Sequence, residues 1–169
     1  LVGLVMIMGA MLCCQDGLRK FPSNYIYLSI FTICMSYQLG MASIFYNTHI
    51  LIQAIGITGI ITITLTIYAC QTACDFTDKG GYLISFLLGI TLIGIINIFV
   101  MNSVLENIYA GLGVIIFSCF IVYDTQLIIG GKHYKYSYSI DDYVFAAISI
   151  YLDIINLFIY ILQLFSNRD

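Results

Sequence analysis

The chain has 169 residues, of which 61% are hydrophobic and only 9% are charged. A soluble domain carries about 25% charged residues, so this composition excludes an ordinary water-soluble fold. With six Lys and Arg against nine Asp and Glu, the chain has no basic surface for nucleic acid. A membrane-spanning helix needs about 20 apolar residues, which leaves room for about six spans. The sequence predicts an all-α, polytopic membrane helix bundle in contact with the lipid bilayer.

The first apolar run covers residues 1–14 and begins at the first position of the sequence. It is too short to cross a bilayer alone, and it lacks the charged start and small-residue cleavage site of a signal peptide. We interpret it as the second half of a helix. The sequence is therefore expected to be a fragment of one bundle domain over residues 1–169, without at least part of one helix at its start.

Five further apolar runs follow, each about as long as a membrane span. They cover residues 25–46, 50–71, 81–101, 108–129 and 143–165. The connections between the runs are short, and they cover residues 15–24, 47–49, 72–80, 102–107 and 130–142. The prediction is six helices, the first of them partial, with no soluble domain between them.

The basic residues predict the orientation of the bundle. Among the connections, only the first, third and fifth contain Lys or Arg, namely Arg19, Lys20, Lys79, Lys132 and Lys135, while the sixth basic residue, Arg168, follows the last apolar run. The positive-inside rule places these three connections in the cytosol. If every run crosses, the C-terminus lies on the far side; a last segment that enters the membrane and returns would leave it cytosolic.

Two acids, Asp124 and Asp153, lie inside apolar runs, whereas the other thirteen charged residues lie in connections or at helix ends. An acid at membrane depth costs about 2.5–3.5 kcal/mol on insertion scales, so it is usually paired, hydrated or functional. Asp124 is a lone acid on an apolar face. Asp153 shares its helix face with a polar stripe typical of a helix that lines a hydrated crevice; the stripe consists of Ser149, Asn156, Tyr160 and Gln163.

The apolar runs contain no Lys, Arg or His, so the simplest arrangement is that Asp124 and Asp153 contact each other and share a proton. Such a pair depends on pH and can admit a hard cation such as Ca²⁺, which prefers oxygen ligands. No resident metal site and no cofactor is assigned. The alternative is that Asp124 is hydrated near the interface and that Asp153 belongs to an internal hydrogen-bond network.

The last third of the chain, YDTQLIIGGKHYKYSYSIDDYVFAAISIYLDIINLFIYILQLF, resembles the C-terminal signature of the Bax inhibitor motif family. The resemblance is to its lifeguard branch, to which the glutamate-receptor-associated protein belongs. The stretches RKFPSNYIYLSIFT and CQTACDFTDKGG are similar to the same branch. The resemblance covers the chain from the family's second transmembrane helix to its end.

This resemblance implies a seven-helix bundle with the last helix at its centre, so the family's first helix and cytosolic N-terminus are missing here. It implies a calcium leak in endomembranes such as the ER or Golgi, with the plasma membrane as the alternative, and suppression of apoptosis. The acids of the sixth and seventh helices then form a pH-sensing gate, and they match Asp124 and Asp153. In some members a basic residue near the second helix contacts this pair, and the candidates here are Arg19 and Lys20.

A first rival interpretation is an intramembrane aspartyl protease, which also needs two carboxyl groups that share a proton. That family has a GxG motif before its second acid and a Pro-Ala-Leu segment. Here Ile150, Tyr151 and Leu152 precede Asp153, and Pro22 is the only proline. We therefore do not expect an enzyme.

A second rival interpretation is a membrane adaptor that conducts no ions and inhibits cell death by binding receptor or death-pathway membrane proteins. The connection at residues 130–142 is the longest cytosolic surface available for such a partner. Calcium flux through purified protein in liposomes distinguishes the adaptor from the leak.

Overall fold

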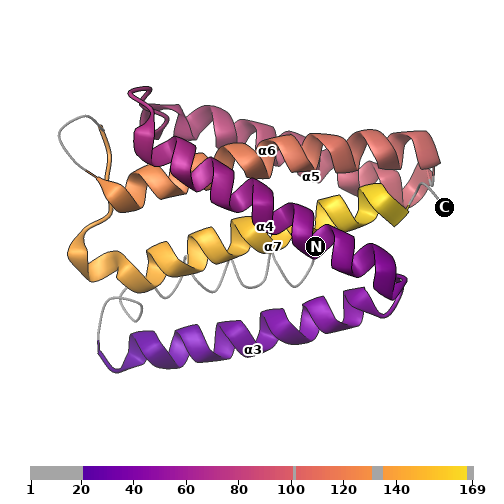
Figure 1. Ribbon diagram of the computed structural model, residues 1–169, viewed down its shortest axis with the longest axis horizontal. Coiled ribbons are helices and arrows are strands. Elements are labelled where there is room, and N and C mark those ends of the chain that lie inside the picture. The colour runs from indigo at the N-terminus through magenta and orange to yellow at the C-terminus, as the bar shows by residue number, and fades with distance from the viewer. Residues whose placement is uncertain (1–20, 101, 131–134, 167–169) are drawn as a thin grey trace.

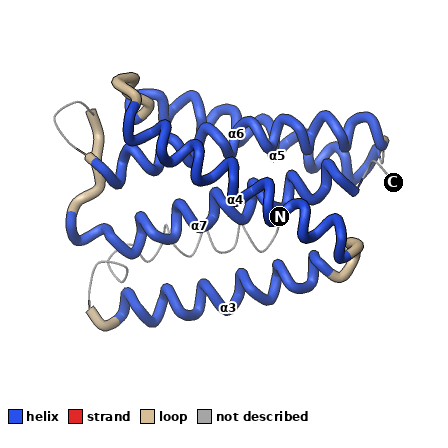
Figure 2. The backbone as a smooth tube through the Cα atoms, viewed as in Figure 1, coloured by secondary structure: helices blue, strands red, loops and turns tan. Residues whose placement is uncertain are grey.

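The computed structural model describes residues 21–100, 102–130 and 135–166, and within these residues it is helical, with no strand (Figure 2). All five long helices are long and apolar enough to span a membrane, so the prediction of an all-α polytopic bundle is confirmed. The run at residues 1–14, Arg19 and Lys20 lie outside the described residues. The helices are α3 (Ser23–Ser43), α4 (Thr48–Gln71), α5 (Gly80–Val100), α6 (Ser103–Ile129) and α7 (Tyr143–Ser166), with two short 3-10 helices, η1 (Thr77–Lys79) and η2 (Ile140–Asp142).

The start of α6 corrects the prediction, which placed residues 102–107 in a connection. The helix begins at Ser103 because the Asn102 side chain caps it and accepts a hydrogen bond from the backbone N–H of Val104 at 2.9 Å. Glu106 lies in the first turn, where the positive end of the helix dipole favours a carboxylate. Glu106 is therefore a residue of α6 and faces the bundle from a fixed position.

The connection between α3 and α4 also lies earlier in the chain than predicted. Helix α3 ends at Ser43, and α4 begins at Thr48 after Asn47, whose extended backbone lets the chain reverse direction. Residues 44–46, which are apolar or aromatic, were predicted to continue the helix. They form the turn because the reversal needs a few residues before the Asn47 cap, whatever their hydropathy.

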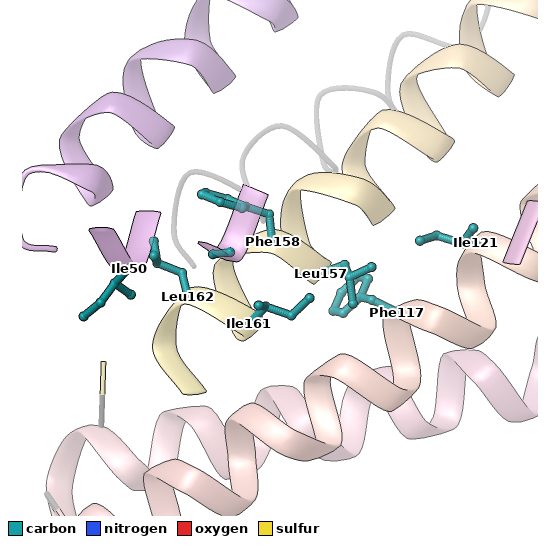
Figure 3. Close-up of a cluster of buried hydrophobic side chains, with 8 residues drawn as sticks. Ile50, Phe117, Ile121, Leu157, Phe158, Ile161 and Leu162 are labelled. Atoms are coloured by element: carbon teal, nitrogen blue, oxygen red, sulfur yellow. The ribbon is translucent and has the colours of Figure 1, made fainter. Parts of the chain in front are cut away.

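Helix α7 lies between α3 on one side and α4 and α6 on the other, while α5 packs on α6 (Figure 1). Eleven residues of α7 are buried, but only three residues of α3. The side chains that join α7 to α4 and α6 are shown in Figure 3; they are Ile50, Ala54, Phe117, Ile121, Leu157, Phe158, Ile161 and Leu162. A second cluster joins α7 to α3 through Phe31, Met35, Val144, Ile148, Leu152 and Ile155.

The two ends of the bundle carry different connections. The α4–α5 and α6–α7 connections contact each other at one end, which we call the basic end because it carries Lys79 and Lys135. The predicted placement of these two connections on the same side is confirmed. Helix α7 is continuous from Tyr143 to Ser166 and runs from the basic end to the opposite end, where α3 meets α4 (Figure 1). A last segment that enters the bundle and returns is therefore wrong for these residues.

Candidate functional site

The two acids predicted to pair do contact each other across the α6–α7 interface. A side-chain hydrogen bond joins the carboxyl groups of Asp124 and Asp153, and each residue is only 6% exposed. Asp124 lies five residues before the end of α6, and Asp153 lies near the middle of α7. Packing of α7 into the angle between α4 and α6 brings the acids together, since the apolar residues around both are buried in that interface.

The surroundings of the acid pair contain few charges. Within the described residues of α3 to α7, the only Lys, Arg or His is His49, at the start of α4 and at the opposite end of the bundle. The Oδ2 atom of Asp153 is buried and receives no hydrogen bond from any N–H or hydroxyl group of the described residues. The groups that do lie close to the pair are two phenols, Tyr123 on α6 and Tyr138 on the α6–α7 connection.

The polar stripe predicted on α7 is present, but its side chains pack against protein groups. Tyr160 donates to the hydroxyl of Tyr109 on α6 at 2.9 Å, and the Gln163 amide donates to Glu106 at 3.0 Å. The Asn156 amide donates to a backbone carbonyl of its own helix, and Ser149 accepts a bond from Tyr138. In this structure the stripe forms a polar seam of hydrogen-bonded side chains, and the hydrated crevice remains a prediction.

Two glycines let the helices approach closely beside this seam. The backbone of Gly113 on α6 lies directly against the ring of Tyr160, so that a Cβ atom there would overlap it. A Cβ atom at Gly94 on α5 would lie 2.9 Å from the hydroxyl oxygen of Tyr109. The rings of Tyr160 and Tyr109 therefore occupy spaces that exist because these positions lack a Cβ atom. This packing holds the two hydroxyl groups opposite each other.

At the basic end, Gln126 attaches the α4–α5 connection to α6. Its side chain is fully buried, donates to the backbone carbonyl of Cys74 at 2.9 Å and accepts from the backbone N–H of Phe76 at 2.8 Å. A buried amide that satisfies two backbone groups of a loop holds that loop in one position. The connection is thereby fixed over the end of α6, where Gln126 lies two residues after Asp124.

The same connection also binds the segment that leads into α7. Asp75 accepts the backbone N–H of Lys135 at 3.0 Å, and Thr77 accepts the backbone N–H of Tyr136 at 3.2 Å. Lys135 also forms an ion pair with Asp78. We call these three contacts the clasp. The hydrogen bond from Thr77 lowers the pKa of the Asp75 carboxyl, and Asp78 raises the pKa of Lys135.

Sequence reasoning missed several of these residues. Gln126 stands inside the quoted YDTQ motif, and an amide in an apolar run was a signal for a buried hydrogen-bonding role. Tyr138 and Glu106 gave no comparable signal, because both were assigned to connections. No group of three or more His, Cys, Asp or Glu residues that could hold a metal ion occurs in the described part of the chain.

A bundle of membrane-length helices with a hydrogen-bonded pair of buried acids between its last two helices defines a polytopic membrane protein with an intramembrane carboxyl site. The profile of the family described as "Bax1-I: Inhibitor of apoptosis-promoting Bax1" matches residues 1–169. The chain belongs to this Bax inhibitor family, as its C-terminal signature predicted.

Relatives at 36–40% identity carry the name lifeguard, which confirms the predicted branch. The chain is 40% identical to human "Protein lifeguard 3" over 163 residues, which are 93% of this chain and 51% of that protein. It is 39% identical to the mouse protein of the same name over 163 residues, 93% of this chain and 52% of that protein. It is 36% identical to "Protein LIFEGUARD 4" of Arabidopsis thaliana over 155 residues, 89% of this chain and 60% of that protein. The chain spans about half the length of the lifeguard 3 proteins.

Proposed function

We propose that the protein suppresses apoptosis as a cation leak in endomembranes, with Ca²⁺ as the transported ion and the Asp124–Asp153 pair as its pH-sensitive gate. The observation that carries this proposal is the direct hydrogen bond between two buried carboxyl groups on neighbouring helices. The description of its family as an inhibitor of apoptosis-promoting Bax1 supports the role in cell death. The anti-apoptotic role, the ion and the membrane all belong to this proposal.

The chemistry of the pair explains why a proton would control it. Two carboxyl groups in contact hold one proton between them, because two facing carboxylates repel each other in a poorly solvated place. One proton therefore decides whether α6 and α7 are joined by a neutral link or face each other with two negative charges. The groups facing the pair are Tyr123 and Tyr138, and the parts of α3, α4 and α5 packed around it carry no Lys, Arg, His, Asp or Glu.

The same oxygens suit the proposed ion. Ca²⁺ binds carboxylate and carbonyl oxygens, so it competes with the shared proton for Asp124 and Asp153. The seam of α7 continues from the pair through Asn156 and Tyr160 to Gln163 and gives a row of polar groups toward the opposite end. The positive-inside rule places the basic end in the cytosol in this proposal. A basic latch at Arg19 or Lys20 remains part of it.

Calcium flux through the purified full chain in liposomes tests the proposal. We expect native flux to differ severalfold between about pH 6 and about pH 8, because the pair titrates as a unit. The double variant Asp124→Asn and Asp153→Asn should lose this pH response. Asp141→Asn is the matched control, since Asp141 is an exposed acid outside the seam, and it should respond to pH like the native chain.

Two results would overturn the gate. The first is a double variant that keeps the native pH response, since the proton would then bind elsewhere. The second is native protein that passes no Ca²⁺ at any pH, which would favour a membrane adaptor that acts by binding receptor or death-pathway partners. Cleavage of a membrane substrate that a transition-state inhibitor abolishes would instead favour the protease interpretation.

A further inference from the structure

One aromatic residue of the α6–α7 connection is turned inward, whereas its described neighbours face outward. Tyr138 is half-buried, while Lys135, Tyr136, Ser137 and Ser139 are exposed. Its hydroxyl lies 3.5 Å from the Ser149 hydroxyl, one helical turn before Asp153 on α7. The ring therefore lies between the acid pair and the basic end.

The backbone holds Tyr138 in this place from both sides. Its N–H donates to the carbonyl of Leu127 near the end of α6 at 3.0 Å, after the chain has reversed at Gly130, which has a φ of 59°. The next residue, Ser139, forms a capping box with Asp142 just before α7 begins. The Tyr138 ring packs edge-on against Phe145 with 5.7 Å between the ring centres. A residue tied this closely to both helices does not swing freely.

The clasp adds a second constraint from another part of the chain. The backbone N–H groups of Lys135 and Tyr136, three and two residues before Tyr138, donate to Asp75 and Thr77, respectively. The other oxygen of Asp75 accepts both the N–H and the hydroxyl of Thr77, at 2.8 and 2.6 Å. The α4–α5 connection is in turn fixed to α6 by Gln126. The segment that carries Tyr138 is therefore held by a closed chain of contacts that begins and ends on α6.

We propose that Tyr138 is the residue that closes the acid pair to water from the basic end, and that the clasp keeps it closed. This inference rests on the proposed function, because closing the acid pair to water has a function only if the pair exchanges protons or ions. Its geometry does not depend on conduction. In this proposal the Tyr138 ring blocks the path of water to the acid pair, and the weak 3.5 Å contact between its hydroxyl and that of Ser149 only orients the ring.

Chemical modification of the acid pair tests the closure independently of ion flux. The full chain in lipid nanodiscs is treated with a water-soluble carbodiimide and glycine ethyl ester, and modified Asp124 and Asp153 are measured by peptide mass spectrometry. We expect Tyr138→Ala to raise their modification rate about tenfold, which corresponds to a loss of about 1.4 kcal/mol from the closed state. Asp75→Ala, which breaks the clasp, should raise it about threefold.

Three controls separate closure from damage to the fold. Tyr136→Ala removes an exposed ring of the same connection but keeps the backbone N–H that donates to Thr77 in the clasp, so it should leave the rate unchanged. Tyr138→Phe keeps the ring and should also modify at the native rate. Asp141 is exposed, so its modification is the internal standard and should be equal in all variants. If Tyr138→Ala is not folded, Asp75→Ala and Tyr138→Leu provide the same comparison.

The proposal is wrong if the acid pair is modified at the native rate in both Tyr138→Ala and Asp75→Ala. It is also wrong if Tyr136→Ala has the same effect as Tyr138→Ala, since loosening of the connection would then explain both. Flux measured on the same samples distinguishes the two proposals. If no variant passes Ca²⁺ while the modification rates follow the expected order, the leak fails and the closure stands.

Discussion

The seam between α6 and α7 is closed differently at its two ends. Toward the opposite end, side chains of the helices bind each other directly, through Tyr160 with Tyr109 and Gln163 with Glu106. Toward the basic end, the closing residue is Tyr138, which belongs to the α6–α7 connection, contacts Ser149 on α7 and is held in place by the α4–α5 connection. Opening the opposite end requires two packed helices to separate, whereas opening the basic end requires only a loop to move. Loops open locally at much lower free energy than packed helices.

The largest effect is expected at the opposite end, from Gly113→Leu. A side chain at this position overlaps the Tyr160 ring, so α6 and α7 must separate or the ring must leave this space. Overpacking of this kind costs about 1–3 kcal/mol or more. We expect the midpoint of thermal unfolding in detergent to fall by several degrees, together with loss of the Tyr160–Tyr109 contact.

Gly111→Leu is the matched control for this substitution. Gly111 lies two residues away on the same helix, and a Cβ atom there meets nothing within 4 Å. The same glycine-to-leucine change should therefore leave the unfolding midpoint nearly unchanged. Since leucine is a better helix former than glycine, equal losses from Gly111→Leu and Gly113→Leu would show that the close approach of Tyr160 to Gly113 is not what determines the stability of this end.

A smaller effect is expected from the two phenols. Tyr160→Phe leaves the Tyr109 hydroxyl without its partner, and Tyr109→Phe does the same to Tyr160. Hydrogen bonds between membrane helices contribute about 0.6 kcal/mol on average and at most about 1.7. Each single variant should lose stability in this range, and the double variant should lose no more than either one. Losses that add in the double variant would show that the two hydroxyl groups act independently.

The sequence predicted the centre of this seam better than its ends. Asp124 and Asp153 were identified because an acid in an apolar run is costly, and the absence of intramembrane bases left each acid as the other's partner. Glu106 was missed because its polar neighbours suggested a connection, although Asn102 caps a helix there. Hydropathy marks where a chain is apolar, but it does not show that a capped helix continues through polar residues.

The closing residue at the basic end could not be predicted for a different reason. The position of Tyr138 follows from contacts between residues about 60 positions apart, such as Lys135 with Asp75. Hydropathy and spacing report on neighbours along one helix, and they say nothing about which two connections meet. The positive-inside rule placed both connections at the same end, and only the folded chain shows that they bind each other.

The smallest effect concerns pH at the clasp. The hydrogen bond from Thr77 lowers the pKa of Asp75 below its ordinary value of 3.8. The stabilisation that the ionised Asp75 carboxylate gives to the clasp is therefore present above pH 3.8 and is lost as pH falls through the folded-state pKa of Asp75. Asp78 raises the pKa of Lys135 above 10.5. The stabilisation from the Lys135–Asp78 ion pair is therefore present below pH 10.5 and is lost as pH rises through the folded-state pKa of Lys135. Neither group changes its charge between about pH 5 and about pH 9.

Hydrogen exchange of the Lys135 and Tyr136 backbone amides, corrected for intrinsic rates, measures this directly. Their protection should stay constant across that range and fall only in stronger acid, where Asp75 takes up a proton and becomes a weaker acceptor. Asp75→Asn, which has no proton to gain, should remove the acid-dependent fall. Protection that changes near neutral pH would place the pH response in the clasp. Constant protection across that range would show that the clasp itself does not carry a pH response near neutral pH.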